Sequence, residues 1–391
     1  MSRIYLDWAA TAVPEMVLPA APFGNPSSAH AEGREAREAL ESARSRCAAV
    51  LGVKSENLYF TSGGTESNTL VLHSFLLHAL SLGSSRARLL CSAVEHPSVM
   101  ENCLLLEKLK VPVGYITVEK DGRVSEGTFA GALKKYPDAR FAAVMGVNNE
   151  TGSMMEMGKL VSLARQNGEK TGLPVHIHAD LVQALGKVPV DITGWDLDSA
   201  SFSSHKLGGP RGIGLLYMKK PMPSLYRGGE QEGGFRPGTE NTQGALALAD
   251  VLERRACAET VRAESEKARE RFRYLIGNLK ELKQSSGKPI CTLLPDDRGE
   301  DDPRFSPWIL QARFAGIPGA VMVRALDEAG VAVSTGSACS SSSPDRPILS
   351  AMGLDKSAQL EGIRISQGWT TEKADLDALL SGIEKVLSCL K

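Results

Sequence analysis

A single lysine stands in a segment that suits covalent chemistry better than a solvated surface. Lys206 follows the hydroxyl-rich run Ser201–Ser204 and His205, and two glycines and a proline come after it. A lysine at the end of a buried strand can hold pyridoxal phosphate through a covalent bond to the cofactor's aldehyde. Ser203 and His205 would then reach the cofactor phosphate. A basic turn is the alternative, and this segment alone does not decide between the two.

A carboxylate at the end of an earlier strand favours the cofactor site. Asp180 closes the run His178-Ala179-Asp180, which precedes Lys206 in the chain. Pyridoxal phosphate accepts electrons only while its ring nitrogen stays protonated, and a neighbouring carboxylate favours that charged form. We expect Asp180 in this role, with Gln183 near the ring hydroxyl. The alternative for Asp180 is a helix N-cap.

Three further segments follow predicted strands and carry groups that a phosphorylated cofactor needs. In Phe60–Asn68, a strand runs through two glycines into a helix, whose free N–H groups attract anions, so we expect Gly64 and Thr65 to contact the phosphate. His96 is positioned to stack on the pyridine ring and carry protons. Asn149 is positioned to hold the ring oxygen and a substrate carboxylate. The carboxyl ends of strands in an open α/β sheet are where such ligands bind.

One pair of histidines has a spacing that could bind a metal ion. His176 and His178 share one face of a predicted strand. No third ligand is apparent in the sequence, so a structural role is favoured and no metal is predicted.

Apolar runs alternate with helical patterns through the first two thirds of the chain and give the elements that position these groups. The expected strands are 58–60, 88–91, 114–118, 141–145, 175–179 and 199–202. Helical spacing over 36–50, 97–109 and 157–165 lies between strands or beside them, and Gly52 is the expected stop of the first helix. This alternation predicts an α/β fold with a mostly parallel sheet flanked by helices.

A second, smaller α/β domain is expected towards the C-terminus. One long charged helical stretch over about 241–283 leads to it, followed by apolar runs and a terminal helix near 373–387. The predicted division is a large cofactor-binding domain over 14–245 and a small domain formed by 1–13 and 246–391.

Charge and cysteine usage exclude several classes of protein. The 391 residues carry 45 basic and 46 acidic side chains, so no net field favours nucleic acid or an anionic membrane. No apolar run is long enough to span a bilayer, and the N-terminus lacks the apolar core of a signal peptide. The seven cysteines are scattered without a C-x-x-C pair. That distribution is typical of a reducing compartment, and we expect a cytoplasmic protein.

Cys339 has unusual neighbours for a structural cysteine. It lies in Thr335–Pro344, a stretch of small polar residues with little to pack against. Buried structural cysteines normally sit among apolar side chains. A thiol on such a loop is well suited to collect a group at one location and deliver it at another. We therefore expect Cys339 to be a nucleophile.

These segments together resemble the class V aminotransferase family, and within it the cysteine desulfurases of the NifS/IscS group. The matching motifs occur in the same order along nearly the whole chain: Tyr5–Asp7, Gly24–Ser28, Phe60–Ser67, Glu95-His96, Val147–Glu150, His178–Gln183, Ser201–Lys206, Arg236–Thr239, Ser334–Cys339 and Ile363–Ser366. The resemblance implies a seven-stranded large domain and a small domain, arranged as in aspartate aminotransferase.

The resemblance also assigns roles, residue by residue. Lys206 would hold the cofactor, and Arg364 would bind the substrate carboxylate through its planar fork. Thr239 would reach the phosphate of the neighbouring subunit in a homodimer. The residues that would contact the cofactor are Gly64, Thr65, Asn149, Gln183, Ser203, Ser204 and His205. The catalytic residues would be Cys339, Lys206 and His96.

The implied activity is cysteine desulfuration. L-cysteine would give L-alanine and a persulfide on Cys339, which passes to an acceptor protein or scaffold for iron–sulfur cluster assembly or tRNA thiolation. A selenocysteine lyase, and a pyridoxal-phosphate aminotransferase or C–S lyase in which Cys339 is incidental, remain alternatives, as does a non-catalytic sulfur carrier. The chain is shorter than the family pattern between Asp7 and Gly24, and it lacks the C-terminal tail that docks a scaffold in some relatives.

Overall fold

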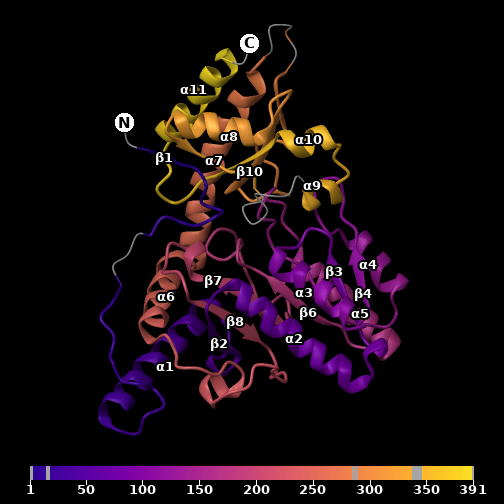
Figure 1. Ribbon diagram of the computed structural model, residues 1–391, viewed down its shortest axis with the longest axis vertical. Helices are drawn as coiled ribbons and strands as arrows, with labels where there is room; N and C mark the ends of the chain where they lie inside the picture. Colours follow the sequence, from indigo (N-terminus) through magenta and orange to yellow (C-terminus); the bar gives the residue numbers. More distant parts are fainter. Residues whose placement is uncertain (1–2, 15–17, 284–286, 288, 337–345, 390–391) are drawn as a thin grey trace.

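The computed structural model describes residues 3–14, 18–283, 287, 289–336 and 346–389. A large sheet unit lies below a smaller unit in Figure 1, and both ends of the chain are at the smaller unit. In the described residues no helix is long and apolar enough to cross a membrane.

The large sheet has seven strands in the order β2-β8-β7-β6-β5-β3-β4. Their bounds are β2 Leu58–Thr61, β3 Arg88–Ser92, β4 Val113–Ile116, β5 Ala139–Ala143, β6 His176–Asp180, β7 Ser199–Ser203 and β8 Gly214–Met218. Strands β4, β3, β5, β6 and β7 pair in parallel, whereas β8 is antiparallel to both β7 and β2. The predicted α/β fold with a mostly parallel sheet is confirmed.

Helices cover both faces of this sheet because its central strands are apolar on both sides. On β5, Phe141 and Ala143 join the apolar cluster under α2 (Gly64–Leu82) and α3 (Pro97–Lys108). Ala142 alternates with them and joins the cluster on the opposite face. The helices on that second face are α1 (Ala31–Leu51), α4 (Glu126–Lys135), α5 (Met157–Thr171) and α6 (Thr242–Arg255).

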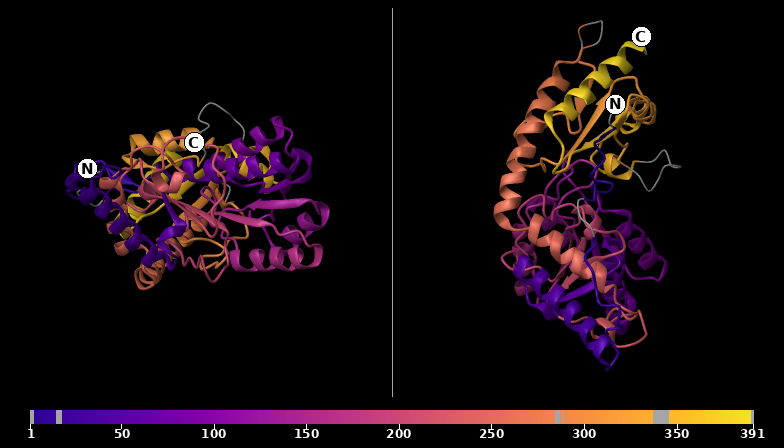
Figure 2. Two further views of the ribbon diagram at one scale, coloured as in Figure 1. Left: turned by 90° about the horizontal axis from the view of Figure 1, so that it is seen from below. Right: turned by 90° about the vertical axis from the view of Figure 1, so that its left-hand side faces the viewer.

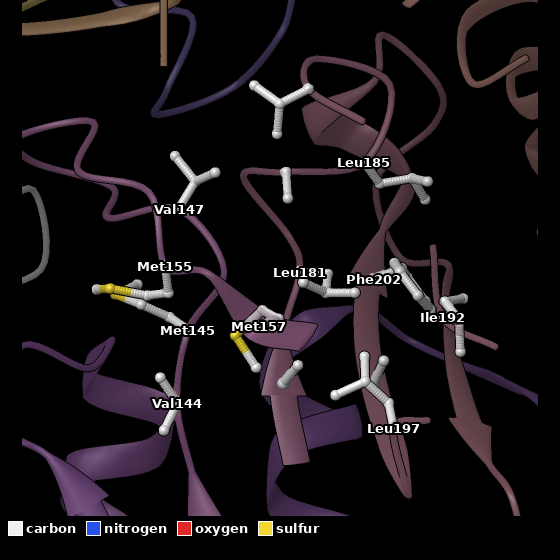
Figure 3. Packing of buried hydrophobic residues seen from close by; sticks show 14 of the residues in the cluster. Val144, Met145, Val147, Met155, Met157, Leu181, Leu185, Ile192, Leu197 and Phe202 are labelled. Carbon is white, nitrogen blue, oxygen red and sulfur yellow. The ribbon is translucent and has the colours of Figure 1, made fainter. Parts of the chain in front are cut away.

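Figure 3 shows part of the cluster on the second face, near the carboxyl ends of the strands. Met145, Met155 and Met157 lie on one side of the view, and Ile192 and Phe202 lie on the other. All five side chains are at most 7% exposed. The loops that follow the strands therefore pack against this apolar cluster, which restricts the positions of their polar side chains.

The expected single helical stretch over 241–283 is wrong in one respect, because it is two helices. Helix α6 ends at Arg255, and α7 (Ala258–Glu281) begins after Cys257, whose backbone is extended. Neither glycine nor proline marks this break. Helix α6 packs against α1, and α7 runs along one side of the molecule from the large unit to the small one (Figure 2, right).

The small unit holds a three-stranded antiparallel sheet, β12-β10-β9. Its strands are β9 Cys291–Leu293, β10 Ile309–Phe314 and β12 Gly362–Ser366, and β1 Ile4–Tyr5 pairs in parallel with β11 Val331–Ala332 beside it. Helices α8 (Gly319–Glu328), α11 (Lys373–Cys389) and part of α7 enclose its apolar core. Two short helices, α9 (Pro347–Ala351) and α10 (Lys356–Glu361), precede β12.

The N-terminal segment belongs to both units. Leu6 lies in the apolar core of the small unit, whereas Trp8, Ala9 and Ala12 lie in the large cluster. The predicted domain boundary at 245 falls inside α6, whose buried residues up to Leu252 also belong to the large cluster.

Candidate active site

Four predicted site segments meet at one edge of the large sheet. Strands β3, β5, β6 and β7 are parallel neighbours, so the segments after them begin on the same side. Those segments contain His96, Asn149, Gln183 and Lys206, and Asp180 ends β6 itself. The sheet topology alone brings these five residues together.

Lys206 is held against the backbone of the N-terminal segment. A single 3₁₀ turn, Ser204–Lys206, follows β7 and turns the lysine back over the strand ends. Its Nζ donates to the carbonyl oxygens of Ala9 at 2.6 Å and Ala10 at 2.7 Å. Gln183 Nε2 donates to the same Ala9 oxygen at 2.8 Å. The amine and the amide thus converge on one carbonyl group.

Asp180 is buried in a network that the sequence did not reveal. Its Oδ1 accepts from the Val182 N–H at 3.0 Å, and its Oδ2 accepts from Asn68 Nδ2 at 2.8 Å. The same Asn68 nitrogen donates to Ser98 Oγ, and Asn68 Oδ1 lies 3.0 Å from His178 Nε2. Burial lowers the pKa of His178 to about 3, so this ring is neutral at physiological pH. The carboxylate is therefore oriented by fixed donors.

His96 caps the N-terminus of α3 and joins the same network. Its Nδ1 accepts from the Ser98 N–H at 3.1 Å and lies 2.8 Å from Ser98 Oγ. Burial lowers the pKa of His96, Lys206 lowers it further, and Asp180 opposes them. A neutral imidazole can accept a proton, which suits the predicted role in proton transfer.

The turn between β2 and α2 is shaped for close approach to an anion. Gly63 has a φ of 149°, which favours glycine, and no side chain caps the helix after it. A Cβ on Gly64 would lie 2.6 Å from Val182 Cγ2, and one on Gly63 would lie 3.5 Å from Ser203 Oγ. The first N–H groups of α2 are therefore not capped by a described side chain, and they lie beside Ser203. Thr65 is exposed next to them.

Three other predicted contacts differ in their surroundings. His205 Nδ1 lies 2.9 Å from Thr11 Oγ1, and burial followed by the charge of Lys206 lowers its pKa to about 4. Ser204 Oγ is buried without a hydrogen-bond partner among the described residues, and a Cβ on Gly209 would lie 2.2 Å from it. Thr239 is exposed.

Arg364 lies where the small unit meets the site. Its guanidinium donates to Asp7 Oδ1 at 2.6 Å and to the Asn149 carbonyl oxygen at 2.9 Å. Two buried atoms here, Arg364 Nε and Asn149 Oδ1, have no hydrogen-bond partner among the residues that the structure describes. Unsatisfied buried polar atoms of this kind are typical of a ligand site.

Cys339 lies outside the described residues, but both described ends of its segment lie near Arg364. Gly336 O accepts from Arg364 at 3.4 Å. At the other end, Arg346 donates to Thr335 O at 2.5 Å and pairs with buried Glu150 at 2.9 Å. The two ends are thereby tied to each other and to the residue after Asn149.

The described cysteines differ from one another in exposure. Cys47, Cys91, Cys103 and Cys291 are buried, and burial raises the pKa of Cys47 and Cys291 to about 12. Such thiols are poor nucleophiles at neutral pH. Cys257 and Cys389 are exposed.

The two histidines weighed as metal ligands have hydrogen-bond partners of their own. Both rings face Ser199 Oγ, His176 Nε2 at 2.7 Å and His178 Nδ1 at 2.8 Å. Among the residues that the structure describes, no group of three His, Cys, Asp or Glu could hold a metal ion.

A cavity of about 310 Å³ lies on the other side of the turn that carries Gln183. Its lining includes Met154, Met155, Met157, Leu181, Val188 and Trp195. None of the predicted site residues lines it, so it is separate from the site at the strand ends.

The chain is similar to known proteins over nearly its whole length. The model of the class-V aminotransferase family matches residues 4–379. A cysteine desulfurase IscS of Dictyoglomus turgidum is 35% identical, over 100% of this chain and 95% of its own. An IscS-like cysteine desulfurase of Mycobacterium tuberculosis is 31% identical, over 96% of this chain and 94% of its own.

Solved structures of similar proteins cover nearly the whole chain. A NifS-like protein has a TM-score of 0.86 at 28% identity and covers 99% of both chains. The structure titled SspA in complex with cysteine has a TM-score of 0.76 at 26% identity, covering 93% of this chain and 98% of that one.

Proposed function

The chain belongs to the class-V aminotransferase family of enzymes, and we propose that it is a pyridoxal-phosphate-dependent cysteine desulfurase. It takes sulfur from L-cysteine, releases L-alanine and holds the sulfur as a persulfide on Cys339. The observation that carries this proposal is the convergence of Lys206, Asp180 and Gln183 at one sheet edge, beside the ends of the segment that contains Cys339. The names of the relatives support the choice of cysteine as substrate.

The residues at the sheet edge fit pyridoxal phosphate. The bare first turn of α2 at Gly64 and Thr65, with Ser203 beside it, suits a phosphate dianion. Asp180 supplies a fixed carboxylate for the ring nitrogen, and Lys206 supplies the amine that the aldehyde needs. Ser204, His205 and the partner subunit's Thr239 are further proposed contacts with the phosphate.

When bound, the cofactor supplies a protonated ring that accepts the electron pair left at the substrate's α-carbon. Lys206 removes the proton from that carbon and returns one to the product. Arg364 binds the substrate carboxylate from the small unit, with Asn149 beside it. His96, neutral because burial lowers its pKa, carries protons between these positions.

Cys339 receives the sulfur. Its thiolate attacks the sulfur of the substrate, an S–S bond forms, and the substrate C–S bond breaks with its electron pair left on carbon. That carbon then takes a proton and leaves as alanine, and a second thiol removes the sulfur from Cys339. No external oxidant is needed, because the substrate carbon keeps the electron pair of the C–S bond and is reduced to the methyl group of alanine, while the transferred sulfur is oxidised to the level of a persulfide.

Two segments near Thr239 support a homodimer. Gln243 Nε2 donates to Pro19 O, and Gln231 Nε2 donates to Ser27 Oγ, so the segment at 18–28 lies along the segment at 225–243. Large apolar side chains are exposed on both, namely Leu18, Phe23, Leu225 and Tyr226. Phe23 is 91% exposed, which is unusual for a large apolar side chain outside an interface.

The decisive test compares Cys339→Ser with Cys257→Ser, which removes an exposed thiol elsewhere. Cysteine turnover is followed as sulfide and alanine in the presence of a reductant, and bound cofactor is followed by its visible absorbance. Cys339→Ser should bind cofactor normally yet lose at least about 100-fold in both products, because the nucleophile is gone. Cys257→Ser should match the wild type. Full activity of Cys339→Ser would overturn the persulfide and favour a C–S lyase.

Two further assays separate the remaining alternatives. Lys206→Ala should lose the visible band of the bound cofactor, and a colourless wild type would indicate a non-catalytic sulfur carrier. A turnover of selenocysteine well above that of cysteine would instead indicate a selenocysteine lyase.

A further inference from the structure

Lys187 is a buried amine to which the proposed reaction gives no role. Its side chain is almost completely buried, and its Nζ donates to Gln183 Oε1 at 2.8 Å. In the described part of the chain no carboxylate forms an ion pair with it. Burial, followed by the charges of Lys206 and Arg364, lowers the pKa of Lys187 to about 7.

The backbone of Lys187 is fixed from two directions. Its carbonyl oxygen accepts from Trp308 Nε1 at 2.7 Å and from Ser265 Oγ at 2.5 Å. These donors come from the segment before β10 and from α7. The lysine is thus held in place by the small unit and by the helix that joins the units, and its side chain reaches from there towards the site.

Packing alone gives no reason for an amine at this position. Burying an ammonium group without a carboxylate is unfavourable, and an apolar side chain of similar length would fit an apolar surrounding better. The surrounding apolar cluster includes Ala184, Leu185 and Val188 from the same turn. The nitrogen therefore acts through Gln183, its hydrogen-bond partner in the described part of the chain.

The hydrogen bond to Lys187 determines which end of the Gln183 carboxamide faces which neighbour. A carboxamide has an oxygen that accepts and a nitrogen that donates. Lys187 takes the oxygen, so the nitrogen turns to the Ala9 carbonyl oxygen, which also accepts from Lys206 Nζ. Without Lys187, the amide would lose the donor that holds its oxygen, and of these two contacts only the one with the Ala9 carbonyl oxygen would orient it.

We propose that Lys187 is a positioning residue, which turns the donor end of Gln183 toward the cofactor. This inference rests on the proposed function, in which Gln183 contacts the ring hydroxyl of pyridoxal phosphate. A nitrogen donor would stabilise negative charge on that oxygen, whereas an amide oxygen would repel it. Lys187 therefore contributes to cofactor affinity although it does not touch the cofactor.

The test is a double-mutant cycle read out as the dissociation constant of pyridoxal phosphate. Cofactor-free wild type, Lys187→Met, Gln183→Leu and the double variant are each titrated with the cofactor and followed by absorbance. Lys187→Met should weaken binding about tenfold, the usual contribution of one hydrogen bond to a charged group. In the Gln183→Leu background the same change should have no further effect, because the group through which it acts is gone. The exposed Lys170→Met serves as the control.

Other outcomes have distinct meanings. An equal dissociation constant for Lys187→Met and wild type, or an equal effect in both Gln183 backgrounds, would overturn the positioning role. The melting temperature of the cofactor-free protein distinguishes the positioning role from a purely structural one. If Lys187 acts only by positioning Gln183, methionine should leave the melting temperature unchanged or raise it. Lys187→Leu repeats the test if the methionine variant does not fold. A wild type that binds no pyridoxal phosphate would overturn the proposed function itself.

Discussion

The carboxyl group of Glu95 is almost completely buried next to the proposed catalytic histidine. Its Oε1 accepts from the Met145 N–H at 2.7 Å and from the Ser92 hydroxyl, and its Oε2 has no hydrogen-bond partner in the described part of the chain. Burial raises its pKa to about 8, with the charge of Asp180 acting in the same direction and the hydrogen bonds from Ser92 and Met145 opposing it. The group is therefore mostly protonated at neutral pH.

Glu95→Gln should make the protein relatively more stable as the pH rises. In the unfolded chain the carboxyl ionises near 4.5, whereas in the folded protein it ionises near 8. The folded state thus binds this proton more tightly, so wild-type stability falls as the pH rises from about 4.5 to about 8. Glutamine keeps an acceptor oxygen and does not ionise. Denaturant unfolding at both ends of this window measures the difference.

Exposed Glu101→Gln is the control for loss of one charge. Its effect on the free energy of unfolding should be small and nearly independent of pH. If the advantage of Glu95→Gln over wild type were the same at both pH values, Glu95 would not be the buried titrating group described here.

Asn68 illustrates what a sequence does not show at the scale of residues. Lys206 and Asp180 could be identified because a strand end places them where a cofactor site is expected. Asn68, by contrast, is a polar residue near the start of a helix, which is the pattern of a solvated face. Only the packing of α2 against the sheet brings it to Asp180 and His178.

Asn68→Leu should lower the free energy of unfolding by roughly 1–3 kcal/mol. The change leaves Asp180 Oδ2 and Ser98 Oγ without a buried donor, and such losses cost about that much. Cofactor affinity should fall as well, because Asp180 loses its orientation. Urea unfolding of the cofactor-free protein and titration with pyridoxal phosphate measure the two effects. The exposed Asn278→Leu should change neither, and loss of stability with unchanged affinity would remove Asn68 from the site.

At the scale of elements, periodicity predicted the parallel strands well because each is a short apolar run before a helix. Strand β8 (Gly214–Met218) was not anticipated. It follows the glycine-rich segment after Lys206 and returns antiparallel to β7, so the alternation of strand and helix does not apply to it. The break between α6 and α7 was not predicted either, because no glycine or proline marks it in the sequence.

The turn before α2 and the turn after β6 approach each other closely at Gly64 and Val182. Gly64→Ala should destabilise the protein by about 1–3 kcal/mol and weaken cofactor binding, because its Cβ would lie 2.6 Å from Val182 Cγ2. The double change with Val182→Ala should restore much of both, since it removes the clash. Thermal unfolding and cofactor titration provide the measurements.

Gly131→Ala is a matched control for adding one methyl group to a helix. It lies in α4, and a Cβ there would meet nothing within 4 Å. This change should leave cofactor affinity unchanged and stabilise the protein by about 0.5–1 kcal/mol. Failure of Val182→Ala to rescue Gly64→Ala would mean that the turn tolerates no side chain for another reason.

At the scale of the whole molecule, the N-terminal segment connects the two units to one site. Its Asp7 pairs with Arg364 of the small unit, and its Ala9 and Ala10 carbonyls hold Lys206 of the large unit. A sequence pattern predicts such a crossing poorly, because the contacts join residues hundreds of positions apart. The shared site explains why neither unit alone contains all the proposed groups.

A second subunit completes this arrangement in our proposal, and complementation tests it. Lys206→Ala removes the cofactor's anchor, and Thr239→Asp introduces a repulsive charge for the phosphate of the neighbouring site. Each variant alone should be inactive. In a heterodimer of the two, one site combines an intact Lys206 with the partner's intact Thr239, and the other site carries both changes. Co-expression with unbiased pairing should therefore restore roughly a quarter of the wild-type activity per chain.

The result depends on where Thr239 acts. If Thr239 served the site of its own chain, each heterodimer site would carry one damaging change and co-expression would restore nothing. A monomer in light scattering would contradict the proposal more directly.

Phe23→Ser, which removes a large exposed apolar side chain beside the Thr239 segment, should weaken the dimer and reduce activity in proportion at low protein concentration. Activity that stays proportional to the dimer fraction would link the apolar surface, Thr239 and the site in one assembly.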